Sequence, residues 1–272
     1  MKPKIMSLFC GVGGIDMGFE NAGFQTVYAT DNWNRACESF KENFPNCEVL
    51  CDDIINLDYK EIKNRFNTID GLVGGPPCPP FSKSRFYRKE KSRGMQDEEG
   101  KKTIKNYFLA VEQLQPKFYL FENVHGFTYK PHRTALEFLE RESDRLGYKT
   151  FYKVLNTADY GVPQVRKRFI CIGVRKSMND FIFPYPSHSD PNKSLKETKN
   201  WITCGEVLND IDFISPDDKK MQAGSKHKSL LKLVPEGSNY LHFTKERDYP
   251  KPIFKWRSRY WSFLLKLSKN RP

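Results

Sequence analysis

The chain has 272 residues, and its 45 Lys and Arg against 33 Asp and Glu give a formal net charge of +12 at neutral pH. Its 38% hydrophobic and 14% aromatic residues exclude disorder along the whole chain, and no apolar run reaches the roughly 18 residues of a membrane helix. The apolar stretch before Gly11 is too short for a signal peptide, so we expect a cytoplasmic protein with no membrane partner.

The first two thirds of the sequence alternate strand and helix patterns, in chain order. Apolar, β-rich segments predict strands at 5–9 and 26–30, a third strand ending near Asp53, and further strands at 68–73, 118–121 and 168–174. Helical spacing marks 15–19, 35–44 and the segment around 107–114. This alternation predicts an α/β fold with a doubly wound, mostly parallel, Rossmann-like sheet. From about residue 185 the chain is loop-rich, so we place a domain at 1–185 and a smaller region at 186–272.

A glycine-rich turn separates the first predicted strand from the first helix. It reads Gly11-Val-Gly-Gly-Ile-Asp16, which completes neither a dinucleotide fingerprint nor a phosphate loop. Asp31 ends the second strand about 20 residues later, where a carboxylate can accept both hydroxyls of a ribose, and Asp53 could accept from an adenine amino group. The set fits an adenosyl ligand without a pyrophosphate; taken singly, either aspartate could also be a helix cap.

The sharpest chemical signal is Cys78, which lies between four prolines in Pro76-Pro-Cys-Pro-Pro80. Proline fixes φ, so the thiol is held rigidly at the end of a strand, as a nucleophile would be. Glu122 brings a carboxylic acid to the same edge of the sheet, and a thiolate beside such an acid suits conjugate addition to a pyrimidine. Arg166 and Arg168 are predicted on one side of a strand, where they could hold a base, a phosphate or the thiol region.

The seven cysteines are odd in number and scattered, which indicates reduced thiols and no metal site. Basic residues concentrate in 83–105 and near the C-terminus, where seven of them, interleaved with aromatic residues, have no acidic residue among them. This pattern indicates a polyanion partner or a solvated basic surface.

Five segments, in this order, resemble the cytosine-C5 DNA methyltransferase family: Phe9-Cys-Gly-Val-Gly-Gly14, Gly75-Pro-Pro-Cys-Pro-Pro-Phe-Ser82, Glu122-Asn-Val124, Asp159-Tyr-Gly-Val-Pro-Gln164 and Gln164-Val-Arg-Lys-Arg168. The resemblance covers about residues 4–175. It implies S-adenosyl-L-methionine as cofactor and methyl transfer to C5 of a cytosine flipped out of double-stranded DNA, in a bacterial or phage restriction–modification or defence system. The protein would then associate with the nucleoid when it binds DNA.

The resemblance also assigns roles to residues. The cofactor would lie over Phe9, Gly11, Gly13 and Pro76, with Asp31 on the ribose, Asp53 and Ile54 at the adenine, and Trp33 one residue beyond the family's usual aromatic position. Cys78 would attack C6 of the cytosine, Glu122 would engage N3 and the exocyclic amine, Arg166 would contact the base, and Arg168 would help position the site. The segment 83–105 would be mobile and close over DNA, and the DNA contacts would come from Ser82, Lys83, Arg85, Arg88, Gln164, Arg257 and Arg259.

The resemblance implies that 1–185 is the catalytic, S-adenosylmethionine-binding domain and that 186–272 is a partial DNA target-recognition region. The sequence departs from the family pattern there, because the recognition region is unfinished and the usual C-terminal motifs are absent before Pro272. Three explanations are open: a split enzyme whose second subunit supplies the missing motifs, a truncated enzyme, or a non-catalytic DNA-binding remnant. A tRNA cytosine-C5 methyltransferase is the alternative from another substrate class.

Overall fold

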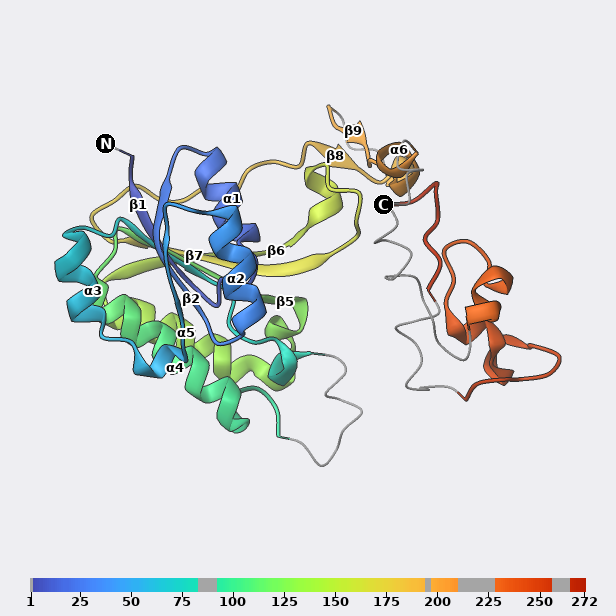
Figure 1. Cartoon of the computed structure of the whole chain (residues 1–272), viewed down its shortest axis with the longest axis horizontal. Helices are drawn as coiled ribbons and strands as arrows, with labels where there is room; N and C mark the ends of the chain where they lie inside the picture. Colours follow the sequence, from blue (N-terminus) through green and yellow to red (C-terminus); the bar gives the residue numbers. More distant parts are fainter. Residues whose placement is uncertain (1, 83–91, 194–196, 210–227, 256–264) are drawn as a thin grey trace. The chain divides into compact units, whose positions relative to one another are not determined.

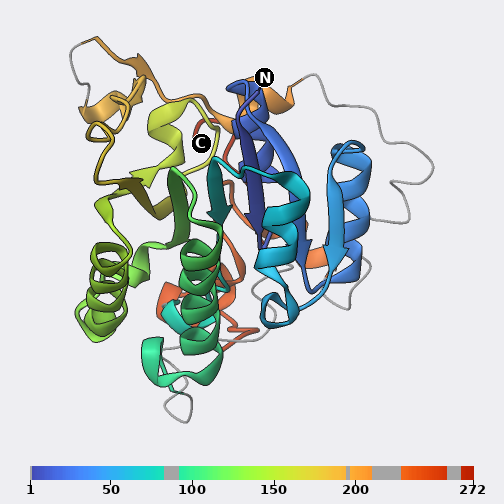
Figure 2. The ribbon, with the colours of Figure 1, turned by 90° about the vertical axis from the view of Figure 1, so that its left-hand side faces the viewer.

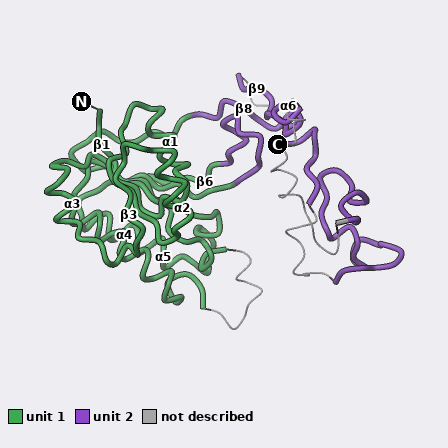
Figure 3. The backbone as a smooth tube through the Cα atoms, in the orientation of Figure 1, with its two compact units in different colours: residues 1–155, 167–184 green, residues 156–166, 185–272 purple. Residues whose placement is uncertain are grey.

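The computed structural model describes residues 2–82, 92–193, 197–209, 228–255 and 265–272. They fall into two compact units (Figure 3). Unit 1 comprises Met1–Leu155 and Lys167–Pro184, and unit 2 comprises Asn156–Arg166 and Tyr185–Pro272. The segment Asn156–Arg166 groups with unit 2, which the sequence did not predict; the functional assignment of the two parts stays a prediction. Among the described residues, no helix is long and apolar enough to cross a membrane.

Unit 1 is built on a seven-stranded sheet with the strand order β3-β2-β1-β4-β5-β7-β6 (Figure 1). The predicted, mostly parallel α/β sheet is confirmed: β1 pairs in parallel with β2 and β4, β2 with β3, and β4 with β5, whereas β5 and β7 are antiparallel. The strands are β1 Lys4–Leu8, β2 Gln25–Asp31, β3 Glu48–Cys51, β4 Gly71–Gly74, β5 Phe118–Val124, β6 Tyr148–Asn156 and β7 Lys167–Arg175.

Helices cover both faces of this sheet (Figures 1 and 2). They are α1 Gly14–Asn21, α2 Asn34–Asn43, α3 Tyr59–Phe66, α4 Glu98–Leu114 and α5 Arg133–Arg145. The alternation of β2 shows the two layers: Tyr28 packs in the large cluster with residues of α3, α4 and α5, whereas the next residue, Ala29, packs with Phe40 and Phe44. Helices α3 and α5 and strand β6 were not predicted from the sequence.

The predicted mobile basic loop is wrong for the described residues from position 92 onward. They form a short 3-10 helix, Gly94–Gln96, and the first two turns of α4. The carboxylate of Asp97 accepts from the N–H of Gly100 (3.1 Å) and caps α4, which fixes where the helix begins. Residues 83–91 lie outside the described part of the chain.

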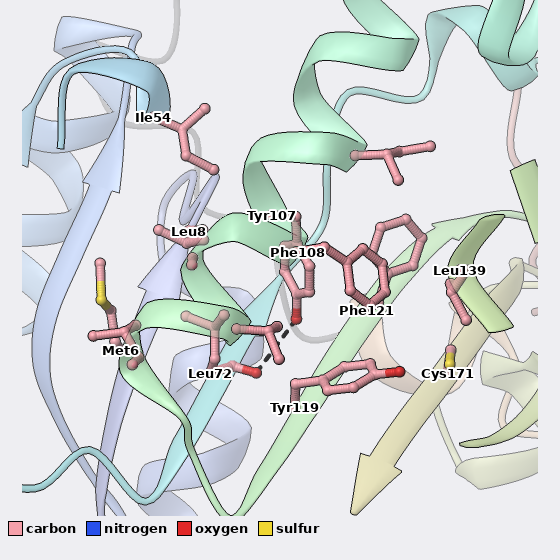
Figure 4. Packing of buried hydrophobic residues seen from close by; sticks show 14 of the residues in the cluster. Met6, Leu8, Ile54, Leu72, Tyr107, Phe108, Tyr119, Phe121, Leu139 and Cys171 are labelled. Carbon is pink, nitrogen blue, oxygen red and sulfur yellow. Dashed lines mark hydrogen bonds between the residues drawn. The ribbon is translucent and has the colours of Figure 1, made fainter. Parts of the chain in front are cut away.

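The core of unit 1 is aromatic and centres on Tyr107 of α4 (Figure 4). Its hydroxyl donates to the carbonyl of Leu120 (2.7 Å) and lies 3.4 Å from that of Leu72, so one side chain reaches two neighbouring strands. Complete burial raises its pKa well above the usual value, and the phenol stays neutral. Helix α4 is thereby fixed against β4 and β5.

Unit 2 has little regular structure in its described residues. Strands β8 (His188–Ser189) and β9 (Lys199–Asn200) pair in parallel, and helix α6 (Cys204–Leu208) begins with a capping box of Thr203 and Glu206. A small cluster consists of Val234, Tyr240, Phe243 and Phe254. The indole N–H of Trp201 donates to Asp159 (2.9 Å), which connects the segment before β7 to the rest of unit 2.

Asp16, on α1, is a buried carboxylate with 1% of its surface exposed. The hydroxyl of Ser7 donates to one of its oxygens (2.9 Å), and that of Thr26 donates to the other (3.4 Å). Loss of solvation outweighs these two hydrogen bonds and raises the pKa of Asp16 to about 6. Because the folded chain holds this proton more tightly than the unfolded chain, the ionised carboxylate destabilises the fold above that pH.

Replacing Asp16 with Asn should therefore stabilise unit 1 at about pH 7, by on the order of 2–3 kcal/mol, because the amide keeps hydrogen-bonding groups and carries no charge. The advantage of Asp16→Asn over the wild type should shrink by about 1 kcal/mol as the pH falls from about 7 to about 5, since Asp16 then becomes protonated. Urea unfolding of both proteins across this range measures the difference. An advantage that grew on acidification would contradict the assignment.

Candidate active site

A cleft of about 170 Å³ opens in unit 1 at the carboxyl ends of its parallel strands. Phe9 follows β1, Asp31 ends β2, and Gly75 follows β4. The chain adds β2 and β3 on one side of β1 and then crosses to β4 on its other side, so the cleft lies where the strand order reverses. Ligands of open α/β sheets bind at such a reversal of strand order. The lining residues are Phe9, Thr30, Asp31, Asn32, Asp52, Asp53, Ile54, Gly75, Pro77, Glu99 and Thr103.

Four of the residues predicted to bind a cofactor line this cleft: Phe9, Asp31, Asp53 and Ile54. The other four, Gly11, Gly13, Trp33 and Pro76, are not part of its lining. The sequence did not identify Glu99 and Thr103, because they come from α4 and no motif marks them. The sequence signal for Asp52 is its position directly before Asp53.

The glycine turn after β1 takes left-handed backbone angles at three positions. They are Phe9 (φ 54°), Gly11 (φ 56°) and Gly13 (φ 92°). A Cβ atom added to Gly13 would overlap the ring of Phe44, so this glycine is needed for both its angle and its close packing. Left-handed angles are uncommon at a bulky residue such as Phe9, and such strain often occurs where a chain approaches a ligand.

Asp31 is held by two backbone amides. One carboxylate oxygen accepts from the N–H of Gly11 (3.0 Å) and the other from the N–H of Trp33 (3.0 Å). Each oxygen keeps a further lone pair, so the carboxylate can still accept two hydroxyl groups. Trp33 directly precedes α2, and 63% of its surface is exposed.

Asp53 caps a short 3-10 helix, Ile54–Asn56, rather than ending a strand as predicted, because β3 already ends at Cys51. One carboxylate oxygen accepts from the N–H of Ile55 (3.2 Å), and the other pairs with the ammonium of Lys102 on α4 (2.9 Å). The bond from Lys102 holds the pKa of Asp53 below its usual value, so this carboxylate stays ionised.

The Cys78 loop, residues 75–82, follows the carboxyl end of β4. Pro79–Phe81 forms a short 3-10 helix, and the ring of Phe81 is buried 4.8 Å from that of Phe127. The amide of the buried Asn123 donates to the carbonyl of Pro76 (3.2 Å). The half-buried Sγ of Cys78 lies 3.9 Å from the same carbonyl, so strand β5 and the loop together fix the thiol.

Glu122 and Arg168 form an ion pair at this edge, with 2.8 Å between Oε1 and Nε and about a fifth of each side chain exposed. Arg168 pairs across β5 and β7 with Val124, two residues beyond Glu122, so the two side chains lie on one face of the sheet. A Cβ atom added to Gly75 would lie 2.8 Å from the other oxygen of Glu122. The carboxylate is therefore in contact with the start of the Cys78 loop.

Arg166 does not share a strand with Arg168, because β7 begins at Lys167, and this prediction is wrong. Its N–H donates to the side chain of Asn156 (3.1 Å), and its carbonyl accepts from Thr157 (3.0 Å), so its backbone closes the loop 156–166 of unit 2 instead of pairing in the sheet. Arg166 and Gln164 are exposed.

The remaining predicted DNA contacts are placed only in part. Ser82 is half-buried at the end of the Cys78 loop, where its N–H donates to Pro79 (3.3 Å). The other predicted contacts lie outside the described residues: Lys83, Arg85, Arg88, Arg257 and Arg259. All seven cysteines are free thiols, and within the described ranges no three His, Cys, Asp or Glu side chains gather as metal ligands.

Comparison with protein families finds one match along almost the whole chain. The family model described as C-5 cytosine-specific DNA methylase matches residues 3–270.

Curated relatives carry the same kind of name. The type II methyltransferase M.SacI of Streptomyces achromogenes is 33% identical over 98% of this chain and 72% of its own length. M.NgoFVII of Neisseria gonorrhoeae is 33% identical over 92% of the chain and 63% of its own length, and M.FnuDI of Fusobacterium nucleatum is 36% identical over 72% and 54%. The chain thus spans a half to three quarters of these relatives.

Solved structures share the fold. A protein described as a DNA modification methyltransferase encoded within an E. coli prophage superposes with a TM-score of 0.61 over 91% of this chain and 69% of its own, at 23% identity. A mutant of DNMT2 from Spodoptera frugiperda gives a TM-score of 0.52 over 74% and 55%, at 24% identity. Identities this low support the fold alone.

The glycine turn provides a matched pair of substitutions. Gly13→Ala should destabilise unit 1 by about 1–3 kcal/mol, because alanine disfavours the left-handed angle and its Cβ overlaps Phe44. Gly14→Ala should be neutral or stabilising by up to about 1 kcal/mol, because Gly14 begins α1 and its Cβ direction is open. Urea unfolding measures both, and equal effects would contradict the role of Gly13.

Asn123→Ala should also destabilise the fold, by about 1–3 kcal/mol, because the carbonyl of Pro76 and the N–H of Val124 each lose the hydrogen bond that the buried Asn123 side chain makes to them. The matched control is Asn43→Ala, whose exposed side chain donates to Val12 (2.9 Å) and should cost at most about 0.5 kcal/mol. Denaturant unfolding compares the two variants. A loss no greater than that of the control would show that Asn123 does not hold the loop.

Proposed function

Since the chain belongs to the C-5 cytosine-specific DNA methylase family, we propose that it transfers a methyl group from S-adenosylmethionine to C5 of cytosine in double-stranded DNA. One observation carries the proposal: the fixed thiol of Cys78 and the Glu122–Arg168 pair lie at the same sheet edge as a cleft that offers the carboxylates of Asp31 and Asp53. Such an edge brings a nucleophile, an acid and a nucleoside site within one unit.

The cleft fits the adenosyl part of the cofactor. Asp31 keeps lone pairs for the ribose hydroxyls, Asp53 can accept from the adenine amine, and the buried Ile54 offers an apolar contact to the base. Phe9, at the start of the glycine turn, also lines the cleft. When bound, S-adenosylmethionine supplies an electrophilic methyl group on a sulfonium.

Cys78 acts as the nucleophile. Its thiolate adds to C6 of the cytosine, and the electron pair of the C5–C6 bond moves toward C5 and the ring. Glu122, as the carboxylic acid, donates a hydrogen bond to N3 and accepts one from the exocyclic amine, which stabilises the negative charge that develops on the ring, while Arg168 holds the carboxyl group in place. With the cofactor bound, C5 would take the methyl group as its bond to the sulfonium sulfur breaks, leaving S-adenosylhomocysteine. A base would then remove the C5 proton, and the C6–S bond would break and release the thiolate.

Arg166 would contact the flipped base, together with the predicted DNA contacts Ser82 and Gln164. Base extrusion is needed because C5 and C6 cannot be attacked from both faces inside the stack. The net charge of +12 suits a duplex partner. The names of M.SacI and M.NgoFVII support a role in restriction–modification.

The chain spans 63% of M.NgoFVII and 54% of M.FnuDI, so whether it is active without another polypeptide is part of the test. We include in the proposal that a second polypeptide completes the enzyme. Cytoplasmic action at the nucleoid follows from a DNA substrate.

The test is covalent trapping on duplex DNA that contains 5-fluorocytosine in many sequence contexts, with S-adenosylmethionine present. Fluorine at C5 blocks the final elimination, so a Cys78 nucleophile should give a stable protein–DNA adduct. Cys78→Ala should abolish the adduct and lower methyl transfer at least about 1000-fold. The control Cys51→Ala removes an exposed thiol and should leave both unchanged.

The assay is run with the chain alone, with the polypeptide encoded immediately downstream, and with tRNA in place of DNA. An adduct only in the presence of the second polypeptide indicates a split enzyme. An adduct on tRNA and none on DNA would contradict the assignment of DNA as the substrate. An adduct retained by Cys78→Ala would contradict the assignment of Cys78 as the nucleophile. DNA binding without any adduct or transfer would indicate a binding protein.

A further inference from the structure

The cofactor cleft carries an excess of negative charge in its lining. Four carboxylates line it, from Asp31, Asp52, Asp53 and Glu99, and its described lining includes no Lys or Arg. Carboxylates brought this close to one another need donors that hold them in place.

Two of these carboxylates are held by neutral donors. Asp31 accepts from backbone N–H groups on both oxygens. Asp52 accepts on one oxygen from the N–H of Asp53 (2.7 Å) and from the side-chain amide of Asn56 (2.7 Å). These bonds join residues one to twenty positions apart in the chain, and they belong to the loops after β1, β2 and β3.

Asp53 differs, because a cation from a distant element holds it. The ammonium of Lys102 lies 2.9 Å from Oδ2 of Asp53, 49 residues away in the sequence, while Oδ1 accepts from Ile55. Both oxygens thus have one donor, from two directions, and this fixes the plane of the carboxylate. Each oxygen keeps a lone pair for a further donor.

Lys102 lies on α4, close to the helix residues that line the cleft. Glu99 and Thr103 on this face line the cleft, and Lys102 lies three residues after Glu99, one turn along the helix. Tyr107, further along α4, is buried against the carbonyls of Leu72 and Leu120, so the helix is a rigid base for the lysine. Lys102 is not part of any motif in the sequence.

The fold itself gains little from this ion pair. The side chain of Lys102 is 37% exposed and that of Asp53 is 35% exposed, and pairs this accessible contribute little to stability. The effect of Lys102 should therefore be on the ligand that Asp53 faces.

Building on the proposed function, we propose that Lys102 positions the Asp53 carboxylate so that the cleft selects a purine with an amino group at C6. An exocyclic amine donates to the fixed carboxylate. A 6-oxo group would instead place its oxygen, an acceptor, against the Asp53 carboxylate, which is also an acceptor. Because neither group can donate, the site rejects that ligand. Lys102 is a positioning residue, since it acts through Asp53.

The experiment measures binding of S-adenosylhomocysteine and of its 6-oxo analogue, S-inosylhomocysteine, to the full chain by calorimetry. Lys102→Met should weaken binding of S-adenosylhomocysteine about five- to tenfold and change that of the 6-oxo analogue by less than about twofold, so the preference for the amine falls. Lys102→Arg keeps a cation and should retain the preference. Lys105→Met removes an exposed lysine of the same helix and should change neither affinity.

Unchanged binding by Lys102→Met, or equal weakening for the two ligands, would overturn the positioning role, because a general disturbance of α4 affects both ligands alike. If the wild-type chain binds neither ligand, the cofactor assignment fails, and the inference fails with it. If the wild type binds both equally, the cofactor assignment stands and the selection by Asp53 and Lys102 is wrong.

Discussion

The carboxyl ends of parallel strands meet at one edge of a sheet, and the candidate site depends on this constraint. Strand β1 pairs in parallel with both β2 and β4, so the loops after all three strands emerge together. Strand β5 continues the same direction beside β4. The antiparallel β7 then brings its amino end to this edge, which explains how Arg168, near the start of β7, meets Glu122 on β5. A parallel β7 would have placed Arg168 at the opposite edge.

Polar side chains at this edge are positioned mainly by backbone groups. Asp31 is oriented by two amides, and Asn123 joins β5 to the carbonyl of Pro76 in the Cys78 loop. Such contacts need no side-chain movement, so the groups keep their orientation without a ligand. The Glu122–Arg168 and Asp53–Lys102 pairs add charge to this framework, and both join residues that are far apart in the sequence.

Helix α4 connects the core to the site. Its buried face carries Tyr107 and Phe108 into the aromatic cluster, while its first turns bring Glu99 and Thr103 to the cleft and Lys102 to Asp53. The helix begins at its Asp97 cap, within a segment whose basic composition had suggested a mobile loop. Composition failed here because charges at spacings of three and four residues also suit the exposed face of a helix.

The sequence by itself determined the order of strands and helices around the glycine turn, the sheet class, the family, and the approach of Asp31 and Asp53 to one cleft. Apolar periodicity and turn residues are local signals that the sequence shows directly. In a parallel sheet, a residue at the carboxyl end of a strand lies at the same edge as the other carboxyl ends, so its position in the sequence predicts its place in the sheet. Helices α3 and α5 were missed although their buried apolar residues recur at helical spacing, Tyr59 and Ile62 in α3 and Ala135 and Leu139 in α5. Only the tertiary structure decided that Arg166 precedes β7, that Arg168 pairs with Glu122, and that Lys102 reaches Asp53, because these relations depend on register and packing between segments that no local pattern connects.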